Sequence, residues 1–196
     1  MSQVRKATIE DLGALAETLV LAFDGYPWTD FAMAEDRRAE RLRRSFSHHL
    51  ALAITHQGEV WMAEDAASVA AWIRPGPPPV PDELLRASER VAAETIGPRM
   101  HALSTVEERL APLRPREPHW LLATMGTRPA ARGRGLASSL LEPVLTQADA
   151  SGTAAALETS TAANVAFYRR FGFEVSGVLD AAGGVPPVWV MVRPPR

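Results

Sequence analysis

The sequence predicts a single-domain α/β or α+β fold, residues 1–196, with a mixed central β-sheet flanked by helices. Its 196 residues fit one domain, and they contain neither an internal repeat nor an interdomain linker. Hydrophobic residues make up 46% of the chain, which is enough for a sizeable core. Strands and helices alternate in the last third of the pattern, an order that is typical of parallel strands joined by helices.

The first half predicts helices around one β-hairpin. Thr8 is a suitable N-cap for a helix whose apolar residues recur at helical spacing, and Gly25 and Pro27 end that helix. The proline-rich segment 75–81 must be a loop, and the sequence leaves its role open. The other expected elements are a strand at 3–7, a helix at 34–52, and hairpin strands at 58–65 and 68–74.

The second half predicts the alternating part of the sheet. The apolar run 119–125 lies between Pro118 and Gly126 and is typical of a buried strand. Gly97 and Pro98 separate two polar helices that precede it. The expected elements are helices at 82–95 and 98–111, a helix from Gly133, a strand at 154–159, a helix at 164–171, and strands at 173–178 and 188–192.

Composition excludes several classes of protein. Cysteine is absent, so disulfides, thiolate metal sites and a cysteine nucleophile are excluded. The 5 histidines show no metal-ligand spacing, so no metal site is expected. No apolar run reaches the length of a membrane span and no signal-peptide stretch begins the chain, so a cytoplasmic location is expected. The oligomeric state stays open, a homodimer included.

A nucleic-acid partner is not expected either. The formal net charge is −2. His48 and His49 lie with several arginines on one predicted helix, but acidic residues are interspersed with them, so this basic face is interpreted as solvated.

A glycine- and arginine-rich turn follows the buried strand and opens the next helix. The first turn of a helix has unpaired N–H groups and a partial positive charge. Gly133 and Gly135 would let an anion approach those groups, and Arg132 and Arg134 would add charge at the rim. The turn matches neither a Walker P-loop nor G-x-G-x-x-G, and by itself it fits a tight strand-to-helix connection equally well.

A second polar pair lies about 30 residues further on. Asn164 and Tyr168 are four residues apart and therefore share a helix face, where they could meet a polar ligand. Taken alone, the pattern favours Tyr168 as an ordinary core aromatic beside Phe167 and Phe171.

Together the two segments resemble the GNAT N-acetyltransferase superfamily. Arg132–Ala137 is similar to its pyrophosphate loop, and Asn164–Phe173 to its following N-x-x-x-x-Y…G-F segment. The resemblance implies a GNAT fold in which two parallel strands, here 119–127 and 154–160, splay apart around acetyl-CoA. The chain also resembles, over nearly its whole length, the antibiotic-inactivating puromycin N-acetyltransferases, for example at Leu157–Ser160. It departs from them at 74–95, which is longer here.

The resemblance also implies roles for individual residues. Tyr168 would act as general acid toward the leaving thiolate, worth roughly 10²–10⁴-fold. A backbone N–H at Met125 would polarise the thioester carbonyl. The residues expected at acetyl-CoA are Met125, Gly126, Thr127, Arg132, Gly133, Arg134, Gly135, Leu136, Ala137, Asn164 and Phe167.

A general base is harder to assign. The positions that hold it in many relatives match Leu121 and Ala123, which are apolar, and His119 is out of register. Glu158 is a candidate catalytic base, but a salt bridge to an arginine accounts for it equally well. A third alternative needs no base, because an α-amine titrates near pH ~8 and is partly neutral in water.

The expected acceptor is a small-molecule amine, with the α-amine of puromycin as the implied example. Its aromatic parts would need aromatic walls, for which Tyr26, Trp28, Phe31 and Trp120 are the candidates. Three alternatives stay open: another small amine as acceptor, a non-catalytic acyl-CoA-binding module, and a generic nucleotide-binding domain.

Overall fold

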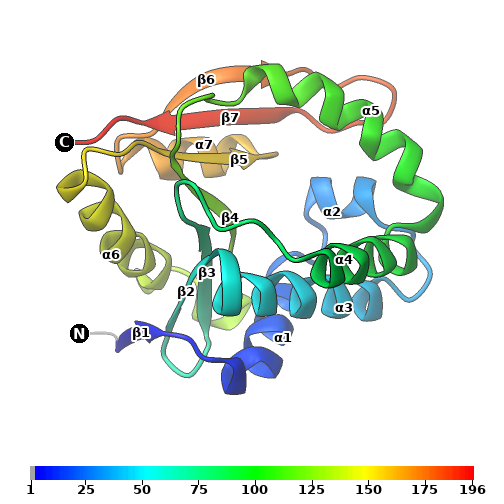
Figure 1. The fold of residues 1–196 in the computed structure, drawn as a ribbon, viewed down its shortest axis with the longest axis horizontal. Coiled ribbons are helices and arrows are strands. Elements are labelled where there is room, and N and C mark those ends of the chain that lie inside the picture. Colours follow the sequence, from blue (N-terminus) through cyan, green and yellow to red (C-terminus); the bar gives the residue numbers. More distant parts are fainter. Residues whose placement is uncertain (1–2) are drawn as a thin grey trace.

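The computed structural model describes residues 3–196 and contains one seven-stranded mixed sheet (Figure 1). The strand order is β1-β2-β3-β4-β5-β7-β6, and only β4 and β5 run parallel among the paired strands. The strands are β1 Val4–Lys6, β2 Gly58–Ala63, β3 Ser68–Ile73, β4 Trp120–Thr127, β5 Ala155–Thr159, β6 Glu174–Leu179 and β7 Val188–Arg193. The predicted mixed sheet is confirmed.

Seven α-helices flank this sheet within the described residues. They are α1 Leu12–Ala22, α2 Pro27–Ala32, α3 Arg38–Leu52, α4 Asp82–Thr95, α5 Met100–Leu110, α6 Leu136–Ala150 and α7 Ala162–Arg169. Each of the helices formed by residues 3–196 is too short or too polar to cross a lipid bilayer.

The prediction missed helix α2. Pro27 ends α1 as expected, but it also occupies the first position of α2, where its missing N–H costs nothing and its fixed φ suits a helix. Tyr26 is the N-cap residue of α2, and Trp28 lies within this helix. The next helix, α3, begins only at Arg38, because Arg37 adopts a left-handed conformation with φ 50°.

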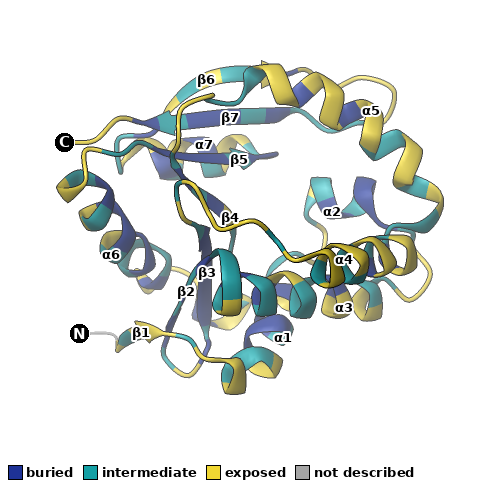
Figure 2. Cartoon of the chain, in the orientation of Figure 1, coloured by how far each residue is buried: buried dark blue, intermediate teal, exposed yellow. Residues whose placement is uncertain are grey.

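Alternate residues of β3 divide the core between the two faces of the sheet. Ala70 and Trp72 pack with α6, whereas Val69 and Ala71 pack with α1 and α3. This follows from the two-residue period of a strand. Figure 2 shows the central strands as buried and the outer faces of the helices as exposed.

The parallel pair β4–β5 separates after three residues. Pairing extends from Trp120 with Ala155 to Leu122 with Leu157 and then stops. At the same point the β3–β4 register shifts, so that Ala123 is an extra residue on β4. Such a β-bulge bends and twists its strand, which turns the rest of β4 away from β5. The splayed parallel pair that the resemblance implies is therefore present.

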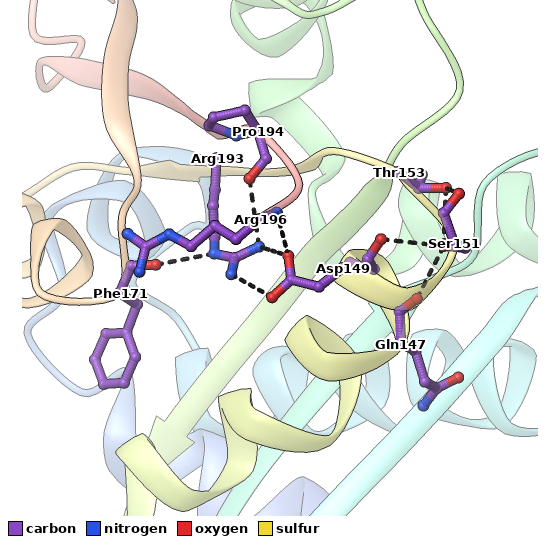
Figure 3. A network of polar contacts seen from close by, with 9 residues as sticks. Gln147, Asp149, Ser151, Thr153, Phe171, Arg193, Pro194 and Arg196 are labelled. Carbon is purple, nitrogen blue, oxygen red and sulfur yellow. Dashed lines mark hydrogen bonds and ion pairs between the residues drawn. The ribbon is translucent and has the colours of Figure 1, made fainter.

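A buried arginine fixes the C-terminal strand to the end of α6 (Figure 3). The Arg193 side chain is only 4% exposed, and its guanidinium makes two 2.7 Å contacts with the Asp149 carboxylate. Its Nε also donates to the Phe171 carbonyl at 2.9 Å. One side chain thus connects α6, β7 and the turn after α7.

Replacing this arginine should cost stability. Arg193→Met keeps the apolar stem but leaves the Phe171 carbonyl without its donor and the Asp149 carboxylate with only the Arg196 N–H, so we expect the Tm at pH 7 to fall by about 5 °C. Thermal denaturation measures the change, with the exposed Arg169→Met as control. Equal Tm values for wild type and Arg193→Met would contradict it.

The same ion pair predicts how the difference depends on pH. Arg193 lowers the pKa of Asp149 from 3.8 to about 2, so the folded state binds this proton less readily than the unfolded state. The stabilisation is therefore complete above pH 3.8 and is lost as the pH falls toward 2. The Tm difference between wild type and Arg193→Met should shrink over that interval.

Candidate active site

A cavity of about 1000 Å³ opens where β4 and β5 separate. The end of α1, the segment 24–29, α3, β4, the end of β5 and α7 line it. The chain has two tyrosines, and both line this cavity. The predicted site residues that line it are Tyr26, Trp28, Met125, Gly126, Thr127, Arg132, Ala137, Glu158, Asn164, Phe167 and Tyr168.

Two predicted acceptor walls lie elsewhere. Trp120 is 7% exposed and packs in the core between the sheet and α6, on the far side of β4 from α1. Phe31 packs with Val106 of α5 and Val190 of β7. Neither lines the cavity, so the expectation for Trp120 and Phe31 is wrong. Both were assigned from residue type, which does not tell which face of an element the side chain occupies.

The turn before α6 has a backbone conformation that leaves several N–H groups unpaired. Gly133 and Gly135 have φ of 77° and 80°, and Gly135 is the N-cap of α6. Within the described residues, no backbone N–H of 133–137 donates a hydrogen bond to another backbone group. A turn that presents several unpaired N–H groups at a helix N-terminus fits a diphosphate. Leu136 anchors this turn, since its own side chain is buried against the sheet.

The two arginines of this turn differ in their surroundings. Arg132 lines the cavity, and its guanidinium donates to the Ala22 carbonyl at 3.2 Å. Arg134 instead makes a 2.6 Å ion pair with Glu64 of the β2–β3 turn. The expectation of two charges at the rim is therefore corrected, because Glu64 already neutralises Arg134.

Gly126 is required by packing. A Cβ at this position would lie 2.7 Å from the Ala22 Cβ and 2.9 Å from the Leu19 Cδ2. Glycine thus lets α1 lie directly against β4, which places the end of α1 and the following turn beside the cavity. The neighbouring Thr127 directs its hydroxyl to Ser68 Oγ, at 2.7 Å.

The Tyr168 side chain is buried but its hydroxyl is unpaired. The residue is 7% exposed, and Phe167 and Phe173 contact its ring edge-on with centroids 5.1 and 5.9 Å away. Among the described residues its hydroxyl has no hydrogen-bond partner, although the ring lines the cavity. Burial raises the pKa of Tyr168 well above its ordinary value, so the phenol keeps its proton at neutral pH.

A chain of hydrogen bonds connects the other tyrosine to α7. The Ser160 N–H donates to the Tyr26 hydroxyl at 2.7 Å, and that hydroxyl lies 3.1 Å from Thr159 Oγ1. Asn164 Nδ2 in turn donates to Thr159 Oγ1 at 2.9 Å. Thr159 and Ser160 had no predicted role beyond the resemblance at 157–160, and no local pattern pairs them with a residue more than 130 positions away.

Removing the Tyr26 hydroxyl should loosen the contact between the segment 24–29 and the end of β5. A single hydrogen bond contributes about 0.5–1.5 kcal/mol, so we expect Tyr26→Phe to raise KM for the acceptor about fivefold. The turn before α6 is untouched, so KM for acetyl-CoA should change less than twofold. Steady-state kinetics with each substrate varied in turn measures both values, and an unchanged acceptor KM would contradict the assigned role.

Glu158 forms the ion pair that the sequence left open. Arg114 Nε and Nη2 both donate to its carboxylate, the latter at 3.2 Å. The same guanidinium contacts Glu107 of α5, and the two carboxylates raise the pKa of Arg114. Both carboxylate oxygens of Glu158 thus accept from Arg114. Ala123 lines the cavity without a polar group, and half-buried His119 bonds the Glu117 carbonyl outside it.

Comparison with known proteins agrees with this geometry. Residues 21–173 match the acetyltransferase (GNAT) family. An acetyltransferase structure from Corynebacterium glutamicum, described as histone acetyltransferase HPA2 and related acetyltransferase, has TM-score 0.75 and 26% identity and covers 100% of this chain and 97% of its own.

Two more distant structures share the fold. The PaiA N-acetyltransferase of Thermoplasma acidophilum, in complex with coenzyme A, has TM-score 0.60 and 14% identity over 99% of both chains. Drosophila melanogaster polyamine N-acetyltransferase has TM-score 0.61 and 17% identity over 99% of this chain and 100% of its own.

The chain belongs to the GNAT acetyltransferase family. It is an acyltransferase, and its acyl donor is acetyl-CoA. The residues present fit that donor: unpaired N–H groups at 133–137 suit the diphosphate, and the gap between β4 and β5 suits an extended arm.

Proposed function

We propose that this protein acetylates the primary amine of a small acceptor that has an aromatic part, with the α-amine of puromycin as the acceptor. The observation that carries the proposal is the unpaired, protonated Tyr168 hydroxyl in a cavity that Arg132 and Ala137, at the two ends of a turn with unpaired backbone N–H groups, also line. Tyr26 and Trp28 give this cavity the aromatic surface that a substituted tyrosine needs.

The reaction would proceed by direct attack. The neutral amine attacks the acetyl carbonyl carbon, a C–N bond forms, and the C–S bond breaks. Tyr168 gives its proton to the leaving sulfur and regains one from water, while the amine loses its proton to solvent. A backbone N–H at Met125 is our candidate for polarising the carbonyl.

No strong base is required for an α-amine. Such a group titrates near pH ~8, so a useful fraction is neutral at physiological pH. Both carboxylate oxygens of Glu158 already accept hydrogen bonds from Arg114, so we favour proton loss to solvent over proton transfer to Glu158.

A second acceptor class is favoured by one carboxylate. Asp24 is exposed, lines the cavity, and has no ion-pair partner in residues 3–196. An unpaired carboxylate attracts a cation, so a polyamine such as the substrate of the Drosophila relative is the alternative acceptor.

A thiol-release assay separates these alternatives. Protein and acetyl-CoA are mixed with a panel of amines (puromycin, O-methyltyrosinamide, spermidine and agmatine), and released thiol is followed with a disulfide reagent. Thiol release with puromycin supports the proposal. Release with another amine but not with puromycin would show that the other amine is the acceptor. Binding of acetyl-CoA without release on any amine would contradict the enzymatic function.

A further inference from the structure

The face of α3 that lines the cavity is apolar except at two positions. Its cavity residues recur at helical spacing, and Leu42 and Leu50 among them are almost fully buried. Ser45 and His49 are the polar members, one turn apart on this face. Leu42 and Leu50 are buried, whereas His49 is exposed at the cavity wall. The residues of the stripe are Leu42, Ser45, Phe46, His49 and Leu50 of α3, and Ala53 directly after it.

One ring nitrogen of His49 has its partner within α3. Nδ1 lies 2.8 Å from the Ser45 carbonyl oxygen. A carbonyl only accepts hydrogen bonds, so Nδ1 carries the proton and Nε2 carries the lone pair. The tautomer and the ring orientation are thereby fixed by the helix itself.

The other ring nitrogen has no partner in the protein. Nε2 makes no hydrogen bond to a described residue, and His49 is an exposed residue that lines the cavity. Desolvation by neighbouring side chains lowers the pKa of His49 below its ordinary value of 6.5, so the ring is neutral at pH 7 and Nε2 accepts rather than donates. The titratable residues that share the cavity are Asp24, Tyr26, Arg132, Glu158 and Tyr168.

We infer that His49 is a specificity-determining contact for the acceptor, whose own N–H or O–H group donates to Nε2. The inference rests on the proposed function, since it requires the acceptor to occupy this cavity. It adds a requirement for the acceptor's chemistry: besides the reacting amine, the molecule carries a second hydrogen-bond donor that reaches the α3 wall. The ribose hydroxyls of a nucleoside satisfy that requirement.

The neighbouring histidine provides a matched control. His48 Nε2 bonds Ser88 Oγ of α4 at 2.8 Å, and His48 does not line the cavity. His48→Phe and His49→Phe therefore make the same chemical change one residue apart, and only the second removes an acceptor from the cavity.

The experiment compares these variants on the amine of the panel that wild type acetylates fastest. His49→Phe should raise KM for that amine at least tenfold, with kcat and KM for acetyl-CoA changed less than twofold, as expected for lost binding energy that is equal in the ground and transition states. His49→Gln places an amide oxygen near the position of Nε2 and should restore most of the affinity. His48→Phe should behave as wild type.

The possible outcomes separate this inference from the proposed acceptor. If wild type prefers an amine other than puromycin, the proposed acceptor is wrong, while the comparison on the preferred amine still decides the role of His49. An acceptor KM within twofold of wild type in His49→Phe, or an equal rise in His48→Phe, would overturn the inference. Absence of turnover with every amine would contradict both. Thermal denaturation checks folding, with His49→Leu as a second apolar variant.

Discussion

Tyr168→Phe is expected to lower kcat by about 10²–10³-fold, because the variant removes the hydroxyl that we propose as proton donor to the leaving sulfur. The phenol has the properties of such an acid: burial raises its pKa so that it stays protonated, and its hydroxyl has no other partner among residues 3–196. The acetyl donor is held elsewhere, so its KM should change less than threefold. Steady-state kinetics on the preferred amine measures both constants.

The same variant should leave stability unchanged. Phenylalanine fills the same volume, and no hydrogen bond of the folded protein is lost, so we expect a Tm within about 2 °C of wild type. This separates a chemical role from a packing role, for which Phe167→Ala is the contrast because it opens the aromatic contacts around Tyr168. An undiminished kcat in Tyr168→Phe would exclude this tyrosine as the acid.

Gly135→Val is expected to weaken acetyl-CoA binding by about 10-fold to 100-fold. Gly135 has φ 80° at the N-cap of α6, a conformation that costs a β-branched residue about 1–3 kcal/mol. A Cβ there has open space around it, so the effect comes from the backbone and not from a clash within the protein. A shifted turn would misdirect the N–H groups of 133–137. Calorimetric titration with acetyl-CoA measures the affinity.

A glycine of similar backbone conformation controls for strain alone. Gly152 has φ 63°, has equally open surroundings, and lies in the turn between α6 and β5. Gly152→Val should lower Tm by a similar amount and leave the affinity for acetyl-CoA within twofold. Equal affinity losses in the two variants would show that the turn before α6 has no special part in binding.

Several features of the site follow from short segments. The turn at 132–137 and the pair Asn164 and Tyr168 were both predicted, because glycine conformation, helix starts and four-residue spacing are local properties. The predicted splay of β4 and β5 came from the resemblance, and the extra residue Ala123 gives it a physical cause.

Other features depend on distant partners and were not predicted. Arg114 pairs with Glu158 from 44 positions away in the sequence, and Arg134 pairs with Glu64, which belongs to the distant β2–β3 turn. Trp120 and Phe31 have suitable aromatic side chains but lie in the core. Successive residues of a strand point to opposite faces of the sheet, and Trp120 of β4 points to the face covered by α6. Phe31 of α2 packs against α5 and β7.

The sequence by itself predicted the order of the strands and of the helices other than α2, the glycine-rich turn before α6, and the shared helix face of Asn164 and Tyr168, since each depends on the conformational preferences of a few neighbouring residues. Only the tertiary structure decided which carboxylates are already paired, that the Tyr26 hydroxyl anchors the end of β5, and that His49 of α3 lines the same cavity as Tyr168. Those properties require segments far apart in the chain to pack together, and burial and hydrogen bonding are then set by the packing.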